Sequence, residues 1–303
     1  YIYYEPPYKI VLKNFLIEDF KADTLFFVKK IKVSPQKFSI KRNFFEIDKI
    51  EIQNFRFKYI ADSNGYSNLD YFVDNLPESE TTDTITTSKP FNLLIKKIII
   101  RNSSFLYDTK EDQTAAMGLD FRHIDLRRIN LRMSNFSIID DSISFSIQNL
   151  WAYEKSGFRI RHLSADFFYK DALSLEKLVV SFNKSQIISN LIYIKPYQNA
   201  WTDYNNLVLN LDIADFSTFD ISDLSYFSDS LRNFFFRLKF GTDSKGTLGD
   251  YKVDDCSIKY ANNTQVVFNG SLSNLMDTKQ AYFDINLVKI FVTKSDLEKI
   301  SNP

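Results

Sequence analysis

The residues of this chain that could do chemistry are few and lie far apart. The two histidines, His123 and His162, stand in Arg-His-Ile and Arg-His-Leu. Neither has a second histidine, a cysteine or a carboxylate at the spacing that a metal site or a catalytic pair requires. We expect both histidines to be solvent-facing strand residues. Cys256, the one cysteine, has no paired histidine motif either, and we expect it to be a small buried residue.

Two aspartate pairs and one glycine-containing segment complete the candidates. Asp140-Asp141 and Asp254-Asp255 are typical of turns, because aspartate tolerates turn geometry and bonds its own backbone. Neither pair has the spacing of a calcium loop. The segment 241–249 includes Lys245-Gly-Thr, a faint likeness to a phosphate loop, but it lacks the usual Gly-Lys-Ser/Thr ending and is interpreted as a tight turn. We therefore expect no catalytic residue, no metal site and no cofactor, and we expect that the chain is not an enzyme.

Composition narrows the class of protein further. The 303 residues contain 38 basic and 38 acidic side chains, a net charge of +0, with no basic stripe of the kind that nucleic-acid-binding proteins carry. We expect no nucleic-acid partner. A single cysteine excludes an intrachain disulfide. No apolar run reaches the length of a membrane-spanning helix. The 29 phenylalanines and 17 tyrosines favour β-structure.

A strand signature occurs three times and shows how the chain is built. Each copy reads apolar, any, apolar, polar, Asn, any, any, apolar, and the apolar residues within each half alternate with period two. The polar pair that ends in asparagine adds one residue between the halves, which indicates a bulge or bend. The copies are Ile10 to Ile17, Ile50 to Phe57, and Ile98 to Phe105, with their asparagines at Asn14, Asn54 and Asn102. Repeated strand units predict a chain stacked along an axis.

The alternating pattern divides the chain into two strand-rich blocks. Residues 1–76 form a first block that ends in a short amphipathic helix, where Leu69, Phe72, Val73 and Leu76 fall at helical spacing. Residues 77–90 are polar and threonine-rich and are expected to be a linker loop. Residues 91–303 form the second block, with a helix near 222–236 and a C-terminal helix that starts near 295 from a Ser295–Glu298 capping box.

The apolar stripe of these strands has two interpretations that the pattern leaves open. A second sheet could cover it, as in a sandwich or barrel. Alternatively the sheet could be open and curved, with its apolar face lining a groove for acyl chains. The continuing repeat and the small number of covering helices favour the groove, and a large open apolar surface normally has a ligand.

Parts of the sequence resemble the AsmA-like, TamB-type translocation and assembly family. The likeness lies in the paired-strand signature followed by Asn68-Leu-Asp-Tyr-Phe72, in the segment from Ile17 to Val28, and in the block from Leu238 to Ile300 with Leu275-Met-Asp277 and Ser295-Asp-Leu297. It covers most of the chain, from Tyr8 to Ile300. These are degenerate patterns of order and spacing rather than unique residues.

The resemblance implies a mainly β fold: an elongated, curved antiparallel sheet, bent like a gutter or taco, with a few short amphipathic helices. It implies a periplasmic protein of a Gram-negative bacterium, anchored to the inner membrane by a helix upstream of Tyr1. The implied function is a bridge that conducts phospholipids between the inner and outer membranes and supports outer-membrane biogenesis. The partners would be phospholipid acyl chains and an outer-membrane β-barrel protein or assembly complex. The alternative is a periplasmic scaffold that docks such a barrel without carrying lipid.

Under this interpretation the functional residues are the apolar lining of a groove. A trough of this kind would spare an acyl chain the ~0.8 kcal/mol that each exposed CH₂ costs in water. One sequence does not reveal which parity of each strand faces inward. The expected lining is Ile50, Ile52, Phe57, Ile98, Ile100, Phe105, Leu207, Leu209 and Leu211.

Overall fold

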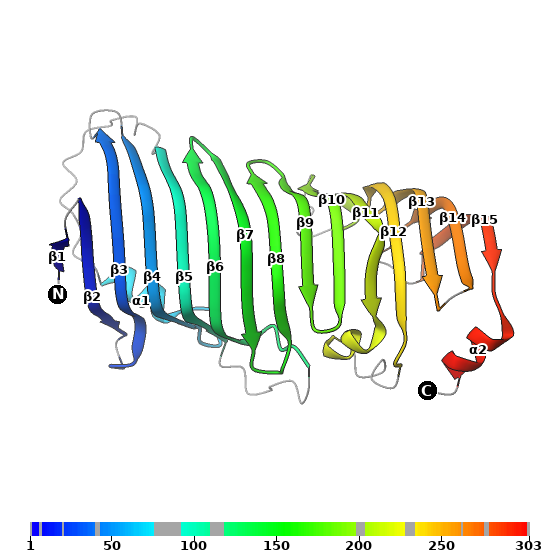
Figure 1. The fold of residues 1–303 in the computed structure, drawn as a ribbon, viewed down its shortest axis with the longest axis horizontal. Coiled ribbons are helices and arrows are strands. Elements are labelled where there is room, and N and C mark those ends of the chain that lie inside the picture. The colour runs from blue at the N-terminus through cyan, green and yellow to red at the C-terminus, as the bar shows by residue number, and fades with distance from the viewer. Residues whose placement is uncertain are drawn as a thin grey trace. The chain divides into compact units, whose positions relative to one another are not determined.

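The computed structural model forms two compact units, Tyr1–Arg159 and Ile160–Pro303. Each unit is a sheet whose strands lie side by side in the order of the sequence (Figure 1). The described residues are 2–5, 8–19, 21–39, 43–75, 92–109, 118–197, 204–227, 234–261, 263–275 and 279–301.

Seven strands make up the first unit, and they form an open sheet. The strands are β1 (Ile2–Glu5), β2 (Lys9–Glu18), β3 (Thr24–Ser39), β4 (Phe44–Ile60), β5 (Asn92–Asp108), β6 (His123–Ile139) and β7 (Ser142–Glu154). Neighbours pair antiparallel except β4 and β5, which are parallel. The mainly β, open-sheet fold is thus confirmed, and the parallel pair is an exception that the strand pattern did not indicate. A parallel pair needs a long crossover, and the β4–β5 connection contains a helix.

That helix, α1 (Asn68–Asp74), is the expected amphipathic segment, and it is tied to the end of β4. Ser67 caps it: the Ser67 hydroxyl accepts from the Asp70 backbone N–H, and the Asp70 carboxylate accepts from the Ser67 N–H. Asn68 is buried, and its amide accepts from the Ile60 N–H at 2.9 Å and donates to the Lys58 carbonyl at 2.9 Å. The asparagine side chain therefore continues the hydrogen bonding of β4 where the strand ladder stops.

The second unit is an antiparallel sheet with short helical segments at its strand ends. Its strands are β8 (Arg159–Tyr169), β9 (Leu173–Phe182), β10 (Ser185–Pro196), β11 (Leu207–Asp220), β12 (Arg237–Thr247), β13 (Asp250–Tyr260), β14 (Thr264–Ser273) and β15 (Tyr282–Phe291). The helical segments are the 3₁₀ turns η2 (Tyr204–Asn206) and η3 (Ile221–Tyr226) and the helix α2 (Lys294–Ser301). Each strand pairs antiparallel with the next one.

The structure agrees with only some of the helices expected from the sequence, and the expected linker lies outside the described residues. The helix expected near 222–236 appears as the 3₁₀ turn Ile221–Tyr226, while residues 228–233 lie outside the described residues. The helix expected near 295 begins at Lys294, and it is Thr293 rather than Ser295 whose hydroxyl accepts from the Asp296 N–H, at 3.3 Å. The linker 77–90 lies outside the described residues, and the strands before and after it, β4 and β5, are direct neighbours.

The three signature asparagines share one unusual backbone conformation. Asn14, Asn54 and Asn102 have φ of 49°, 51° and 49°, in the left-handed region that asparagine tolerates better than most residues. They lie at one level of the sheet, because Lys13 pairs with Lys30, Lys30 with Gln53, and Gln53 with Arg101. The strand ladders are interrupted at this level. The break in alternation that the extra polar residue indicated thus coincides with a left-handed residue; the register does not shift at Asn14 or Asn54, so neither is a bulge.

Candidate functional site

The residues most capable of chemistry do not come together in one site. His123 is not solvent-facing, as the sequence suggested: its side chain is 9% exposed and its Nδ1 lies 3.0 Å from an Asp108 carboxylate oxygen. The reason is that His123 begins β6 directly opposite Asp108, the last residue of β5. His162 is half-buried in β8, 3.3 Å from the Ser164 hydroxyl. Cys256 is half-buried in β13, and burial raises the pKa of its thiol.

One aspartate pair forms the expected turn and the other does not. Asp140 and Asp141 connect β6 to β7, with Asp140 at φ 51°. Asp254 lies inside β13 as the extra residue of a bulge, since Asp243 pairs with Asp255 and Ser244 pairs with Val253. The Asp254 carboxylate contacts the ammonium groups of Lys252 and Lys245. The hydrogen bond from Lys252 is the main reason that the pKa of Asp254 is lowered.

The glycine-containing segment 241–249 is also mostly strand, contrary to the expectation of a tight turn. Residues up to Thr247 belong to β12, and only Leu248 and Gly249 form the turn to β13. Gly246 has φ 141°, and a Cβ at this position would lie 2.4 Å from the Asp250 carbonyl oxygen. Glycine is required here by the close approach of the neighbouring strand rather than by a phosphate ligand.

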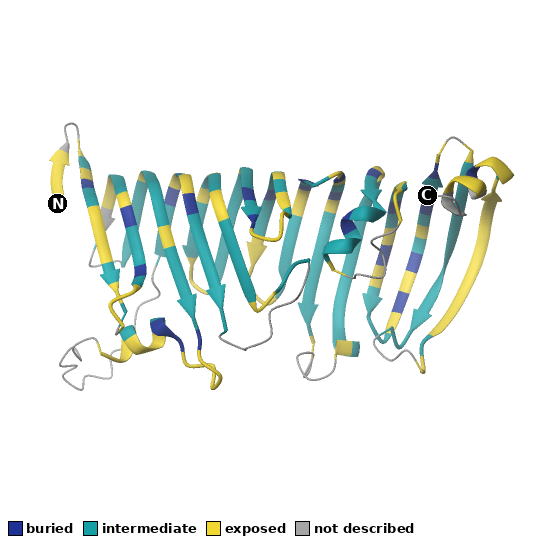
Figure 2. Ribbon diagram, turned by 90° about the horizontal axis from the view of Figure 1, so that it is seen from below, coloured by how far each residue is buried: buried dark blue, intermediate teal, exposed yellow. Residues whose placement is uncertain are grey.

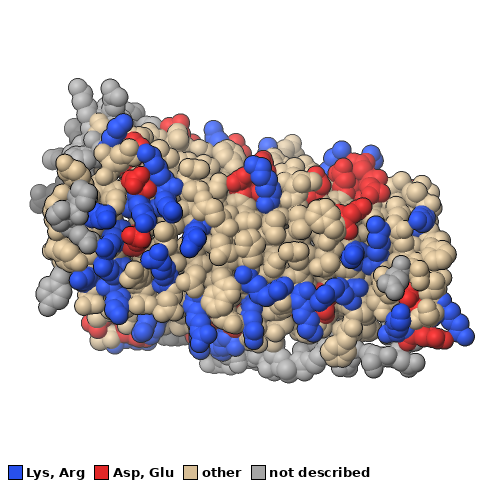
Figure 3. Space-filling model, viewed as in Figure 1, with Lys and Arg blue, Asp and Glu red and all other residues tan. Residues whose placement is uncertain are grey.

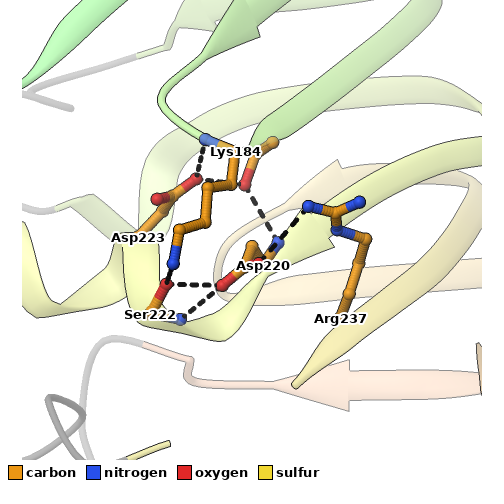
Figure 4. Close-up of polar contacts among 6 residues, drawn as sticks. Lys184, Asp220, Ser222, Asp223 and Arg237 are labelled. Atoms are coloured by element: carbon orange, nitrogen blue, oxygen red, sulfur yellow. Dashed lines mark hydrogen bonds and ion pairs between the residues drawn. The ribbon is translucent and has the colours of Figure 1, made fainter. Parts of the chain in front are cut away.

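A buried polar cluster fastens η3 to the β9–β10 turn (Figure 4). One carboxylate oxygen of Asp223 accepts from the Lys184 backbone N–H at 3.0 Å and from the Ser185 hydroxyl at 2.6 Å. Ser185 in turn accepts from the Asp220 N–H at 3.0 Å. Arg237 lies 3.5 Å from Asp220 at the rim. The contacts of this cluster join parts of the chain to one another, so we assign it a structural role.

In the first unit, the structure brings six of the nine expected lining residues together in matched pairs. Parallel pairing of β4 with β5 sets the isoleucines and phenylalanines of one signature beside those of the next. The pairs are Ile50 with Ile98, Ile52 with Ile100, and Phe57 with Phe105. The same rows continue into β3 and β6, where the partners are Val33, Ile31, Phe26, Met133, Leu131 and Leu126. The repeated signature therefore builds transverse apolar rows across the sheet.

Aromatic rings connect these rows beyond the bend. The Phe26 and Phe55 ring centroids lie 4.9 Å apart, and those of Phe57 and Phe105 lie 5.9 Å apart. Phe15 extends the series to β2, with its ring 5.9 Å from Phe26. Because Phe55 and Phe57 are also neighbours, at 6.4 Å, these rings share one face of the sheet.

The opposite face of the same strands, here called the charged face, carries Lys49, Glu51 and Arg101 beside buried Ile99, which pairs with Glu51 and is 7% exposed. The Glu51 carboxylate lies between Ile50 and Ile52 in sequence, and it pairs with Lys49 at 3.0 Å and with Arg101 at 3.9 Å. Alternation along a strand places Glu51 on the face opposite the two isoleucines. The sheet of the first unit is therefore two-sided. In the view of Figure 3, Lys and Arg predominate over the N-terminal strands.

In the second unit, the remaining three expected lining residues lie along β11. Leu209 pairs with Ile194 and Leu211 with Ile192 on β10, while Leu207 pairs with Pro196. On the next strand, Leu173 and Leu175 of β9 continue the rows of Leu209 and Leu211. This unit thus has its own transverse apolar rows, built as in the first unit.

None of the nine expected lining residues is buried as a core residue would be. All nine are of intermediate exposure, and teal covers most of the strands in Figure 2. A residue between two packed sheets would be nearly inaccessible to solvent. Within the described part of the chain, no second layer covers these rows. The geometry favours an open apolar face over a closed core.

Comparisons with known proteins identify no relative. No family model, no curated protein and no solved structure matches the chain. Among the described residues, no helix is long and apolar enough to cross a membrane, and no group of histidine, cysteine and acidic residues could hold a metal ion.

One feature of the first unit was missed by the sequence reasoning. A basic pocket of about 430 Å³ lies beside the bend, with Lys29, Arg56 and Arg128 among its lining residues. Only part of its signal lay in the signatures, because Asn54 and Asn102 line the pocket while its three cations lie outside the polar pairs. The lining residues come from β3, β4, β5 and β6, and they meet only once the register is known.

Proposed function

We propose that this protein binds the acyl chains of phospholipids along the apolar face of each sheet and lets them move along it. The single observation that carries the proposal is the arrangement and solvent exposure of the nine lining residues. They form continuous cross-strand rows, yet none is buried. An apolar surface of this kind is unfavourable in water unless a ligand covers it.

The magnitude of the effect suits a conduit better than a tight receptor. Each buried CH₂ of an acyl chain gains ~0.8 kcal/mol, whatever its position along the rows. Equivalent rows of isoleucine, leucine and phenylalanine therefore offer similar environments at successive strands. A lipid is shielded throughout and is held in no single deep minimum.

The cellular setting that we propose follows from the family resemblance. In that setting the protein is a periplasmic bridge of a Gram-negative bacterium, anchored to the inner membrane, that passes phospholipids toward the outer membrane. Binding rather than catalysis is its proposed activity.

Leu209→Asp tests the proposal, with Asn210→Asp as a matched control. Both variants introduce one carboxylate on β11, but at opposite parities, so that only Leu209→Asp charges the apolar face. We expect native mass spectrometry to find phospholipid on the wild type and on Asn210→Asp. Leu209→Asp should lose most of it and retain its fold by circular dichroism. Absence of lipid from the wild type would contradict the proposal, and so would unfolding of Leu209→Asp alone, which indicates a closed core.

A second candidate function, docking of a partner strand, is favoured by β15. All ten residues of this strand are exposed, and among the described strands it pairs only with β14. An exposed apolar edge strand can accept another strand by backbone hydrogen bonding. This is the scaffold alternative, in which an outer-membrane barrel or assembly complex is the partner.

A further inference from the structure

The basic pocket of the first unit is separate from the apolar face. The Arg56 guanidinium lies 5.8 Å from the centroid of the Phe27 ring. Arg56 lies between Phe55 and Phe57 in β4, and Phe27 follows Phe26 in β3. Since Phe26, Phe55 and Phe57 share the aromatic face, alternation places Arg56 and Phe27 on the other side of the sheet.

No described residue that lines this pocket balances its positive charge. Lys29, Arg56 and Arg128 contribute three cations, and no lining residue among those described is acidic. Elsewhere in the unit, exposed cations pair with carboxylates, as Lys49 and Arg101 do with Glu51. Cations gathered without a counter-charge repel one another, and a bound anion removes that repulsion.

Polar groups beside the cations are held in place by the bend. The Asn102 side-chain amide donates to the Asn54 amide oxygen at 2.7 Å. The Asn102 backbone N–H donates to the Asn130 amide oxygen at 3.1 Å, and the Asn130 amide donates to the Arg128 carbonyl at 2.8 Å. Ser104 lines the same pocket. These bonds fix the positions of hydrogen-bonding groups around the cations before any ligand arrives.

Arg128 itself adopts an unfavourable backbone conformation. Its φ is 51°, within β6, where arginine gains none of the local bonding that lets asparagine tolerate this region. Its guanidinium lies 5.8 Å from the centroid of the Tyr153 ring. Strained residues of this kind cluster at binding sites, where the strain helps to aim a side chain.

We propose that this pocket binds a phosphate group, carried by a small soluble phosphate or by a phospholipid headgroup at a membrane surface. Arginine forks match the oxygens of a phosphate, and the asparagine and serine side chains supply further hydrogen bonds. The pocket volume of about 430 Å³ accommodates such a group. The site does not depend on the lipid-conducting function, because it lies on the opposite face.

Two binding measurements on the whole chain test the proposal and separate the two sources. Calorimetry with inorganic phosphate at low salt tests the soluble ligand. Flotation with phosphatidylcholine vesicles that contain phosphatidic acid, against phosphatidylcholine alone, tests the headgroup. Saturable binding of free phosphate supports a soluble source, and flotation with the anionic vesicles alone supports a membrane source. Failure of both overturns the proposal.

Variants assign the binding to this pocket. Arg56→Gln combined with Arg128→Gln should weaken binding by about tenfold or more, because two charge-assisted contacts are lost. Arg132→Gln, on β6 but outside the residues that line the pocket, is the control of equal chemistry and should bind as the wild type does. Lys29→Gln, at an exposed position, gives an independent single-residue test if the double variant does not fold. An equal loss in Arg132→Gln would overturn the assignment.

Discussion

At the scale of single residues, asparagine at the centre of each signature serves the backbone. Asn14, Asn54 and Asn102 each interrupt strand alternation with a left-handed residue, so that apolar side chains on both sides of the bend return to one face. The preceding polar residue and the asparagine then both lie toward the charged face. A requirement for left-handed φ explains why this position repeats while its neighbours vary.

Asn54→Val and Asn54→Gly test this role as a pair. Both variants lose the hydrogen bond to Asn102, so the difference between them isolates the backbone term. Because a β-branched residue is unfavourable at φ 51°, the free energy of unfolding of Asn54→Val should be lower than that of Asn54→Gly by ~1–2 kcal/mol. Urea unfolding measures the difference. Equal stability of the two variants would show that Asn54 does not hold the left-handed conformation.

Tyr251 is a residue whose ionisation should limit stability at alkaline pH. It is buried in β13, its hydroxyl lies 3.0 Å from the Ser244 hydroxyl, and desolvation raises its pKa. Because the pKa is higher in the folded state, the stability gained from the neutral tyrosine is fully present below the unfolded-state pKa of about 10. It is lost as the pH rises through the folded-state pKa.

Tyr251→Phe removes the titrating hydroxyl, so comparing its stability with that of the wild type shows the effect of tyrosine ionisation. At pH 8 the variant should be less stable than the wild type by ~1 kcal/mol, because the Ser244 hydroxyl loses its partner. Above pH 10 the gap should narrow, since only the wild type must deprotonate a buried tyrosine. Thermal unfolding across this range checks the trend. A gap that stays constant or widens with pH would be inconsistent with a raised pKa.

The limits of prediction from sequence also appear first at this scale. The break in alternation at Asn14, Asn54 and Asn102 was predictable because an extra polar residue breaks a local period-two pattern. The burial of His123 and the bulge at Asp254 were not, because each depends on a residue of a neighbouring strand. Register between strands is a non-local property that a single sequence leaves open.

At the scale of elements, alternation predicted strands well and pairing poorly. The pairs Ile50–Ile98 and Ile52–Ile100 arise from parallel pairing of β4 with β5, a direction that the repeat did not specify. The helical spacing after Ser222 produced only the 3₁₀ turn Ile221–Tyr226 within the described residues, where Asp220 and Asp223 bond to neighbouring groups. At the described residues, hydrogen bonds of Asp220 and Asp223 thus hold a 3₁₀ turn where the pattern predicted the start of a helix.

The edge strand β15 makes a prediction of its own. Its Leu287, Val288 and Ile290 side chains are 57%, 59% and 61% exposed, which is a recognised route to association between chains. Leu287→Lys combined with Ile290→Lys should reduce concentration-dependent association in analytical ultracentrifugation. The stability of the variant should change little, because the lysines replace exposed side chains. Unchanged association would remove β15 as the contact.

At the scale of the whole molecule, an open sheet and a closed core differ in how far the apolar rows are exposed. The nine lining residues, from both units, are all of intermediate exposure. A residue between two packed sheets would be nearly inaccessible to solvent. Each unit therefore leaves its apolar rows accessible, which is the property on which the proposed lipid conduction depends.

Parity-resolved cross-linking tests that central claim most directly. A photoreactive amino acid is placed at position 50, 51 or 52, and the protein is illuminated while it is loaded with radiolabelled phospholipid. Ile50 and Ile52 lie on the apolar face, and Glu51 lies on the charged face with Lys49 and Arg101. We predict lipid adducts from positions 50 and 52 and none from position 51. Labelling from position 51 alone, or from all three positions equally, would contradict the account.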